Sequence, residues 1–163
     1  MNNLIFLYGL AGAGKNFVGQ VIAEHSHYYF WDADLILTHE MLIAIKHHEL
    51  FSKEMRDKYL NLMIKKINVL LYNHANIVVS QALYRQEQRL TLKSLYPTGK
   101  FVEVAARHSL IRQRLRCRVV GASYQYAKLI QPYFQSDKND MVIVNNSNAS
   151  EILLQVKKLK LIC

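Results

Sequence analysis

The stretch from Leu4 to Lys15 reads Leu-Ile-Phe-Leu-Tyr-Gly-Leu-Ala-Gly-Ala-Gly-Lys, and it decides the class of fold. Its first five residues form a continuous apolar run that ends at Gly9. A run without polar alternation is typical of a strand buried on both faces of a parallel sheet. Beyond the glycines, apolar residues recur at the spacing of a helix face, at Phe17, Val18, Val21 and Ile22. The sequence therefore predicts a strand, a glycine-rich turn and a helix that begins near Lys15.

The rest of the chain repeats this alternation. Short apolar runs predict four further strands, at 28–31, 77–79, 101–105 and 141–144. Apolar periodicity predicts helical structure from Leu35 to about Leu71, from His108 to Arg118, and in a closing helix that Asn148 caps together with Glu151. Alternating strands and helices are typical of an α/β fold. We predict one domain over residues 1–163, a three-layer sandwich with a five-stranded parallel sheet.

The composition fits one globular domain and points to an anionic partner. Of the 163 residues, 51% are hydrophobic, which is enough for a compact core. Lys and Arg number 21 against 12 Asp and Glu, a formal net charge of +9. That surplus fits nucleic acid, an anionic membrane or a phosphorylated metabolite. The sequence shows none of the RNP, zinc or helix-turn-helix signatures, so we do not expect nucleic acid as the partner.

Other features set expectations for location and assembly. The two cysteines, Cys117 and Cys163, form no Cys-x-x-Cys pair, which fits a reducing compartment. No basic segment precedes the first apolar run, and no run approaches the length of a membrane span. We therefore expect a cytoplasmic protein, a monomer or homodimer, without a membrane partner.

Gly9 to Lys15 match the phosphate-binding pattern Gly-x-x-x-x-Gly-Lys, the Walker A motif. In such a loop, backbone N–H groups surround a polyphosphate, the next helix contributes its partly positive N-terminus, and the lysine contacts the outer phosphates. The alternative is a glycine-rich turn without a ligand, but the preceding strand and the following helix favour nucleotide binding. The predicted nucleotide-binding residues of the loop are Gly9, Gly12, Ala13, Gly14, Lys15 and Asn16.

Asn16 departs from this pattern. The motif has Ser or Thr at this position, and that hydroxyl normally binds Mg²⁺. The Asn side chain offers a carbonyl oxygen instead, and Asp32 offers a carboxylate, so both are candidate metal ligands. Weakened metal binding is the alternative. We expect the substitution to affect catalysis more than nucleotide binding.

Asp32 and Asp34 follow the second predicted strand, where ligands bind in open α/β sheets. A spacing of two puts both side chains on one side of an extended chain. A carboxylate there can orient a substrate hydroxyl, accept its proton or hold Mg²⁺ through water. Asp34 has a competing interpretation, because it could cap the next helix. Capping does not explain Asp32, which we therefore predict to be catalytic together with Lys15.

These residues resemble the gluconate kinase and shikimate kinase group of P-loop kinases, and the gluconate kinase branch more closely. Beyond the phosphate loop, the similar segments are 34–60, Ser80–Arg85, Arg114–Arg118 and 125–132. A shikimate kinase is expected to carry three glycines after the third strand, where this chain has Ser80, Gln81 and Ala82. The resemblance implies a P-loop NTPase-type sandwich, ATP with Mg²⁺, a small acidic or polyol metabolite as acceptor, and a short helical lid at approximately residues 114–132.

The chain departs from the gluconate kinase pattern where the acceptor should bind. Leu37 and Thr38 replace a His-Pro pair, Ala44 replaces a lysine, and the lid segment between Arg118 and Gln125 is shorter. The acceptor is therefore left open. The alternatives are a kinase of the shikimate or dephospho-CoA type, and a degenerate kinase that binds nucleotide without turnover.

Arginines supply the remaining candidate residues. Five of them fall between Arg107 and Arg118. Arg114 and Arg118 share a helix face and are predicted to bind ATP, because guanidinium groups make charge-assisted contacts with phosphates. Arg56 and Arg85, with Asp32 and Asp34, are the predicted substrate-binding residues. A solvated basic face is the alternative for any single arginine.

Overall fold

The computed structural model describes residues 3–117 and 122–162, and it confirms the predicted fold class. Its strands form a single sheet in the order β2-β3-β1-β4-β5, and every neighbouring pair is parallel. Their bounds are β1 Asn3–Tyr8, β2 Tyr29–Asp32, β3 Asn76–Ser80, β4 Lys100–Ala105 and β5 Met141–Val144. β1 lies at the centre of the sheet with a partner on each edge, which explains why its sequence is apolar without alternation.

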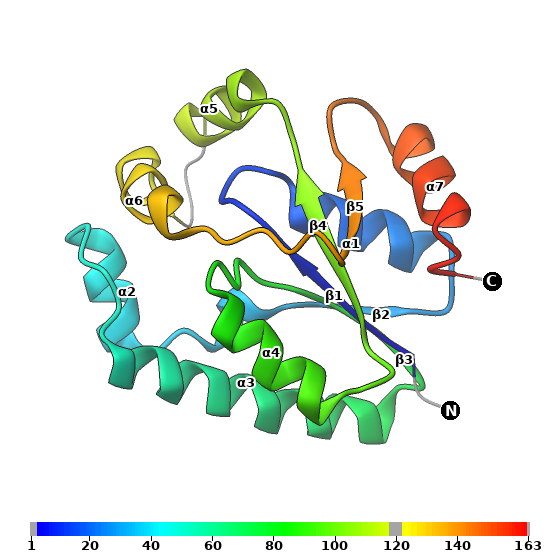
Figure 1. Cartoon of the computed structure of the whole chain (residues 1–163), viewed down its shortest axis with the longest axis horizontal. Helices are drawn as coiled ribbons and strands as arrows, with labels where there is room; N and C mark the ends of the chain where they lie inside the picture. The colour runs from blue at the N-terminus through cyan, green and yellow to red at the C-terminus, as the bar shows by residue number, and fades with distance from the viewer. Residues whose placement is uncertain (1–2, 118–121, 163) are drawn as a thin grey trace.

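Helices cover both faces of the sheet, as Figure 1 shows. One face carries α3 (Lys53–Asn73) and α4 (Gln86–Leu95), and the other carries α1 (Lys15–Glu24) and α7 (Ala149–Lys158). Side chains alternate along β1 between two cores: Leu4 and Phe6 pack with α3 and α4, while Ile5 and Leu7 pack with α1 and α7. Both cores are almost fully buried, so the central strand is held from both sides.

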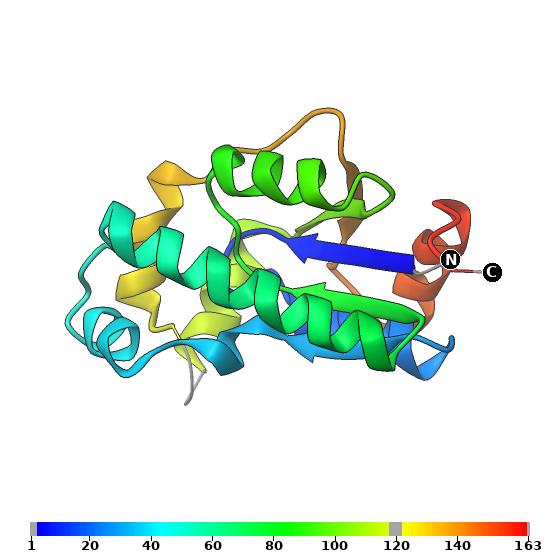
Figure 2. The ribbon, with the colours of Figure 1, turned by 90° about the horizontal axis from the view of Figure 1, so that it is seen from below.

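The remaining helices gather beyond the carboxyl ends of the strands, while both chain termini lie at the opposite end (Figures 1 and 2). They are η1 (Ala33–Ile36), α2 (His39–Lys46), α5 (His108–Arg116), α6 (Tyr124–Ile130) and η2 (Gln131–Tyr133). This end of an open α/β sheet is where ligands bind. None of the helices in the part of the chain that the structure describes is long and apolar enough to cross a membrane.

The predicted helical region from Leu35 to Leu71 is wrong in part, because the structure breaks it between α2 and α3. Thr38 Oγ1 accepts a hydrogen bond from Met41 N and starts α2, and Ser52 Oγ accepts one from Met55 N and starts α3. Between the helices, His48 has a φ of +57°. No glycine or proline marks this break, and for that reason helical periodicity alone misses it.

The last two predicted helices form with small adjustments at their ends. The helix expected from His108 to Arg118 ends at Arg116, and Arg118 lies outside the described residues. Asn148 caps α7 as predicted, because its Oδ1 accepts a hydrogen bond from Glu151 N at 3.1 Å. The Glu151 carboxylate accepts a hydrogen bond from Ser147 Oγ, so only the Asn148 half of a capping box forms.

Charged side chains in the interior fix the segment between η2 and β5 to α4. Arg89 is fully buried and donates to Leu83 O and to Gln135 O. Lys93 Nζ lies 2.9 Å from Asp137 Oδ2 and 2.6 Å from Asp140 Oδ1. Burial lowers the Lys93 pKa, but the hydrogen bonds to the two carboxylates outweigh it and raise that pKa overall. The same hydrogen bond from Lys93 lowers the pKa of Asp137.

Candidate nucleotide and acceptor site

A cavity of about 800 Å³ opens at the carboxyl ends of the strands, between the phosphate loop and the helices α2, α3 and α6. The structure brings eight of the twelve predicted site residues to its wall, namely Gly12, Gly14, Lys15, Asn16, Asp32, Asp34, Arg56 and Arg114. Gly9, Ala13 and Arg85 are not part of this lining. Arg118 lies outside the described residues. The predicted loop, carboxylates and one substrate arginine thus face one space.

The loop between β1 and α1 needs glycine at two positions. Gly14 has a φ of +89°, and a Cβ atom there would lie 2.1 Å from Asn145 Nδ2. Gly9 has a φ of +146°, and a Cβ atom there would lie 2.4 Å from Val104 O. Both backbone conformations are ones that side chains disfavour, and both positions lack room for a side chain. The glycines therefore allow the backbone to approach β4 and the end of β5.

Lys15 is the first residue of α1, and its ammonium group lies back over the loop. Its Nζ donates hydrogen bonds to Gly9 O at 3.0 Å and to Leu10 O at 3.1 Å. The first turn of α1 contains no acidic residue, so the helix N-terminus and the ammonium together make this end of the cavity positive. Such a loop can hold a polyphosphate through backbone N–H groups and one point charge.

Asn145 and Arg114 brace the loop from the other half of the chain. Asn145 is 1% exposed, and its Nδ2 donates to Ala13 O at 2.9 Å and to Gly14 O at 3.4 Å. Arg114 donates to Ala13 O at 3.2 Å and to Asn145 O at 3.1 Å. Asn145 is not among the site residues predicted from the sequence. The signal was available, since Asn145 follows the fifth apolar run at a strand end, as Asp32 follows the second.

Asn16, Asp32 and Ser80 form a hydrogen-bonded group that we call the Asn16 clasp. The register of β2 and β3 sets Asp32 directly beside Ser80. Asn16, on the first turn of α1, spans them: its Nδ2 donates to Asp32 Oδ2 at 2.5 Å, and its Oδ1 accepts from Ser80 Oγ at 2.5 Å. The clasp therefore ties the start of α1 to the ends of two neighbouring strands.

The capping interpretation falls on Asp32 and not on Asp34. Asp32 Oδ1 accepts a hydrogen bond from Asp34 N at 3.0 Å and caps η1. The alternative that Asp34 caps the next helix is not what forms, and the prediction that capping does not explain Asp32 is wrong, because the chain turns into η1 immediately after β2 and leaves Asp32 at the N-cap position. Asp34 Oδ1 instead accepts from Gln81 Nε2 at 3.1 Å. Both carboxylates nevertheless line the cavity.

Tyr59 and Gln81 hold the wall behind these carboxylates. The Tyr59 hydroxyl donates to Ala33 O at 2.8 Å and accepts from Gln81 Nε2. Burial, and next the nearby Asp34 carboxylate, raise the Tyr59 pKa well above its usual value, so the phenol stays protonated. The sequence did not single out Tyr59 for this role, because its partner Ala33 is distant in the chain.

The far end of the cavity combines apolar and cationic side chains. Its apolar lining includes Leu37, Leu42, Ile45 and Phe51, and its cationic lining includes Lys46 and Arg56. Arg56 Nη1 donates to Phe51 O at 2.6 Å, which fixes the guanidinium at the wall. Arg85 lies elsewhere, with its guanidinium carbon 5.8 Å from the centre of the Tyr84 ring and 5.2 Å from that of Tyr133.

Gln88 also lines the cavity and was not anticipated from the sequence. It lies on α4, and its side-chain Oε1 is buried without a hydrogen-bond partner among the described residues. An unpaired buried acceptor is costly, and a ligand that offers an N–H or O–H group would satisfy it.

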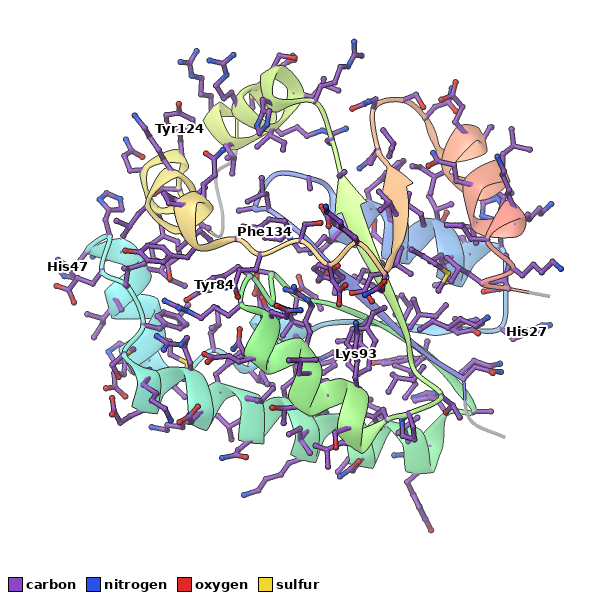
Figure 3. All side chains as sticks on the ribbon, viewed as in Figure 1. His27, His47, Tyr84, Lys93, Tyr124 and Phe134 are labelled. Atoms are coloured by element: carbon purple, nitrogen blue, oxygen red, sulfur yellow. The ribbon has the colours of Figure 1, made fainter. Side chains whose placement is uncertain are left out.

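The residues present do not fit direct binding of Mg²⁺ by Asn16 and Asp32. Their oxygens are of the right chemical type, but each Asp32 oxygen accepts an N–H group, and the Asn16 amide nitrogen faces the carboxylate. The described residues contain no group of three or more His, Cys, Asp or Glu side chains that could hold a metal ion. Figure 3 shows His27 and His47 at opposite ends of the molecule, so these two histidines share no site.

A Walker A loop after a central parallel strand, a carboxylate at the end of a nearby strand and a cavity beside both define the class of P-loop kinases. The profile of the shikimate kinase family matches residues 11–157, and the chain belongs to this family of small-molecule kinases. No curated protein matches the chain at a significant level.

Solved structures show the same fold at low sequence identity. A sugar kinase from Janibacter, without ligand, is 14% identical, with a TM-score of 0.84 over 99% of this chain and 96% of that one. A gluconokinase from Sinorhizobium meliloti is 19% identical, with a TM-score of 0.78 over 96% and 93%. The APS kinase of Mycobacterium tuberculosis, in complex with AMPPNP and APS, is 15% identical, with a TM-score of 0.65 over 98% and 96%.

Proposed function

We propose that this protein transfers the γ-phosphoryl group of ATP to a hydroxyl group of a small acidic or polyol metabolite, in the manner of a gluconate kinase. The observation that carries the proposal is the single cavity whose wall contains Lys15 and the loop glycines together with Asp32 and Arg56. Donor phosphates and an acceptor therefore have adjoining places in one space. The AMPPNP in the complex of the similar APS kinase supports ATP as the donor.

Each group has a defined role in this proposal. The loop N–H groups and Lys15 bind the phosphates and neutralise charge that develops on the transferred group. Asp32 orients the acceptor hydroxyl and takes its proton as the hydroxyl oxygen bonds to the γ-phosphorus, while the bond from that phosphorus to the β–γ bridging oxygen breaks and ADP leaves. Arg114 holds the loop in shape through its hydrogen bond to Ala13 O. Arg118 lies outside the described residues and stays a predicted ATP-binding residue. Catalysis then depends mainly on positioning and electrostatics.

The charges of the far end favour an acceptor that carries an anion. Arg56 and Lys46 line this end, whereas the carboxylates among the described lining residues are Asp32 and Asp34, and Asp32 is bonded to Asn16 beside the phosphate loop. A carboxylate on the acceptor would meet Arg56, and its hydroxyl would then lie toward Asp32. The apolar side chains beside Arg56 fit the carbon skeleton of a compact acid.

The test is ATP consumption with D-gluconate, shikimate and dephospho-CoA as separate acceptors. We expect turnover with one acceptor class, and we expect Lys15→Ala to abolish it. Lys66→Ala, an exposed lysine on α3, is the matched control and should retain the rate. Absence of any acceptor-dependent turnover sensitive to Lys15→Ala would remove the enzyme assignment.

A second candidate is a nucleotide-binding protein without turnover. The Asn16 clasp favours it, because both ends of the Asn16 amide are engaged by protein groups where the motif normally supplies a metal ligand. Thermal stabilisation by ATP, together with no phosphoryl transfer to any of the three acceptors, would support this candidate. Mg²⁺ bound through the nucleotide phosphates stays a prediction for both candidates.

A further inference from the structure

We propose that the Asn16 clasp replaces the metal contact of the phosphate loop, so that the protein binds ATP with nearly the same affinity with and without Mg²⁺. The inference rests on the nucleotide binding of the proposed function, and it concerns what position 16 contributes to that binding. In the usual loop, a Ser or Thr hydroxyl at this position binds Mg²⁺ directly. Here the position carries an amide whose two polar atoms already have protein partners.

The orientation of the Asn16 amide is determined by its neighbours. With Nδ2 toward Asp32, the amide donates to a carboxylate at 2.5 Å and accepts from the Ser80 hydroxyl at 2.5 Å. The reversed amide would set two acceptor oxygens against each other at the same short distance, which is unfavourable. The N–H side of the Asn16 amide therefore faces the Asp32 carboxylate, and the amide oxygen, the atom that could bind a metal, faces the Ser80 hydroxyl.

Asp32 is also occupied on its second oxygen. Its Oδ1 accepts from Asp34 N at 3.0 Å as the cap of η1, while its Oδ2 accepts from Asn16. A cation that bound Asp32 directly would have to share an oxygen with one of these N–H groups. Mg²⁺ requires a nearly ideal octahedron of oxygens at short distances, and it gives up its water reluctantly. The clasp is thus a self-satisfied arrangement that does not need the metal.

Nucleotide binding then rests on charges that the protein itself supplies. These are the Lys15 ammonium and the partial charge of the α1 N-terminus, which meet at the loop with no acidic residue in the first helical turn. Mg²⁺ that arrives on the ATP phosphates remains coordinated by phosphate oxygens and water. Its removal costs the complex no protein–metal bond, so the affinity changes little.

The experiment is calorimetric titration of the full chain with ATP in magnesium chloride and, separately, in EDTA. For the unmodified protein we expect dissociation constants within about threefold of each other, which is below 1 kcal/mol. Asn16→Thr opens the clasp and restores the usual hydroxyl, so its affinity in Mg²⁺ should exceed that in EDTA by about tenfold or more. Asn61→Thr, an exposed position on α3, is the matched control and should behave like the unmodified protein.

The outcomes separate this inference from the proposed function. A tenfold or greater loss of affinity in EDTA for the unmodified protein would overturn the clasp proposal while leaving the kinase assignment intact. Equal affinities in both buffers without phosphoryl transfer would support the clasp proposal and contradict the kinase assignment. No ATP binding in either buffer would overturn both. The titrations of the unmodified protein decide the matter even if Asn16→Thr folds poorly.

Discussion

Replacing Gly14 by alanine tests whether the end of β5 braces the phosphate loop. Gly14 has a φ of +89°, and left-handed backbone costs a residue with a side chain about 1–2 kcal/mol. The new Cβ would lie 2.1 Å from Asn145 Nδ2, so the Asn145 amide must move away. It then loses its hydrogen bonds to Ala13 O and Gly14 O, which together contribute roughly 1–2 kcal/mol.

The expected total is about 3 kcal/mol, which for a domain of this size lowers the melting temperature by roughly 6–12 °C. Urea denaturation followed by linear extrapolation measures the free energy of unfolding directly. The sharper measurement is the double variant with Asn145→Ala. In that background the amide is already gone, so Gly14→Ala should cost only the backbone strain, about 1–2 kcal/mol.

Gly99 provides the control for this coupling. It precedes β4 at the opposite end of the sheet, and its φ is not in the left-handed region. Gly99→Ala and Asn145→Ala should therefore be additive within about 0.5 kcal/mol. If Gly14→Ala and Asn145→Ala were also additive, the contact between the loop and Asn145 would not carry the stability that we assign to it.

Three further expectations follow from the structure. Lys93→Met should lower the melting temperature at neutral pH. The gap in melting temperature between variant and unmodified protein should close as the pH falls below about 4, because a carboxylate with a lowered pKa, here Asp137, stabilises the fold only while it is ionised. A gap that does not change with pH would contradict this. Tyr59→Phe removes the hydrogen bond to Ala33 O and should lower the free energy of unfolding, measured by urea denaturation, by about 1–3 kcal/mol. An unchanged free energy of unfolding would show that this bond does not stabilise the fold. Arg56→Met should raise the KM of an anionic acceptor about tenfold without altering ATP affinity, and an equal loss of ATP affinity would place Arg56 at the donor end.

The layers and the strand count could be predicted because each strand and the phosphate loop can be recognised from a short stretch of sequence. A central strand covered on both faces is apolar throughout, as the sequence of β1 is. The glycines and the lysine of a phosphate loop have a fixed spacing, which Gly9–Lys15 matches directly after this strand. The break between α2 and α3 could not be predicted in the same way. Its signal is one serine cap, Ser52, in a segment whose other residues are compatible with a helix.

The contacts within the site depend on how neighbouring strands pair, so short stretches of sequence could not predict them. Asp32 meets Ser80 only because β2 and β3 pair in one particular register, and Asn145 reaches Ala13 across more than a hundred residues of sequence. Asp32 and Asn145 both stand at the end of an apolar run, but only Asp32 carries a charge, and for that reason it was predicted as a site residue and Asn145 was not. Arg85 was named as a substrate residue because it follows β3, but its side chain lies against Tyr84 and Tyr133, away from the cavity lining.

The strand order also governs what the nascent chain exposes during synthesis. β1, β2 and β3 leave the ribosome first, and β3 and β2 then assemble on one side of β1. The other edge of β1, from Ile5 to Tyr8, stays unpaired until the strand that begins at Lys100 has been made. Until then it presents unpaired N–H and C=O groups on an apolar strand, the kind of edge that pairs with other chains. Fragments that end before Lys100 should therefore self-associate, because the strand that covers this edge of β1 is missing from them.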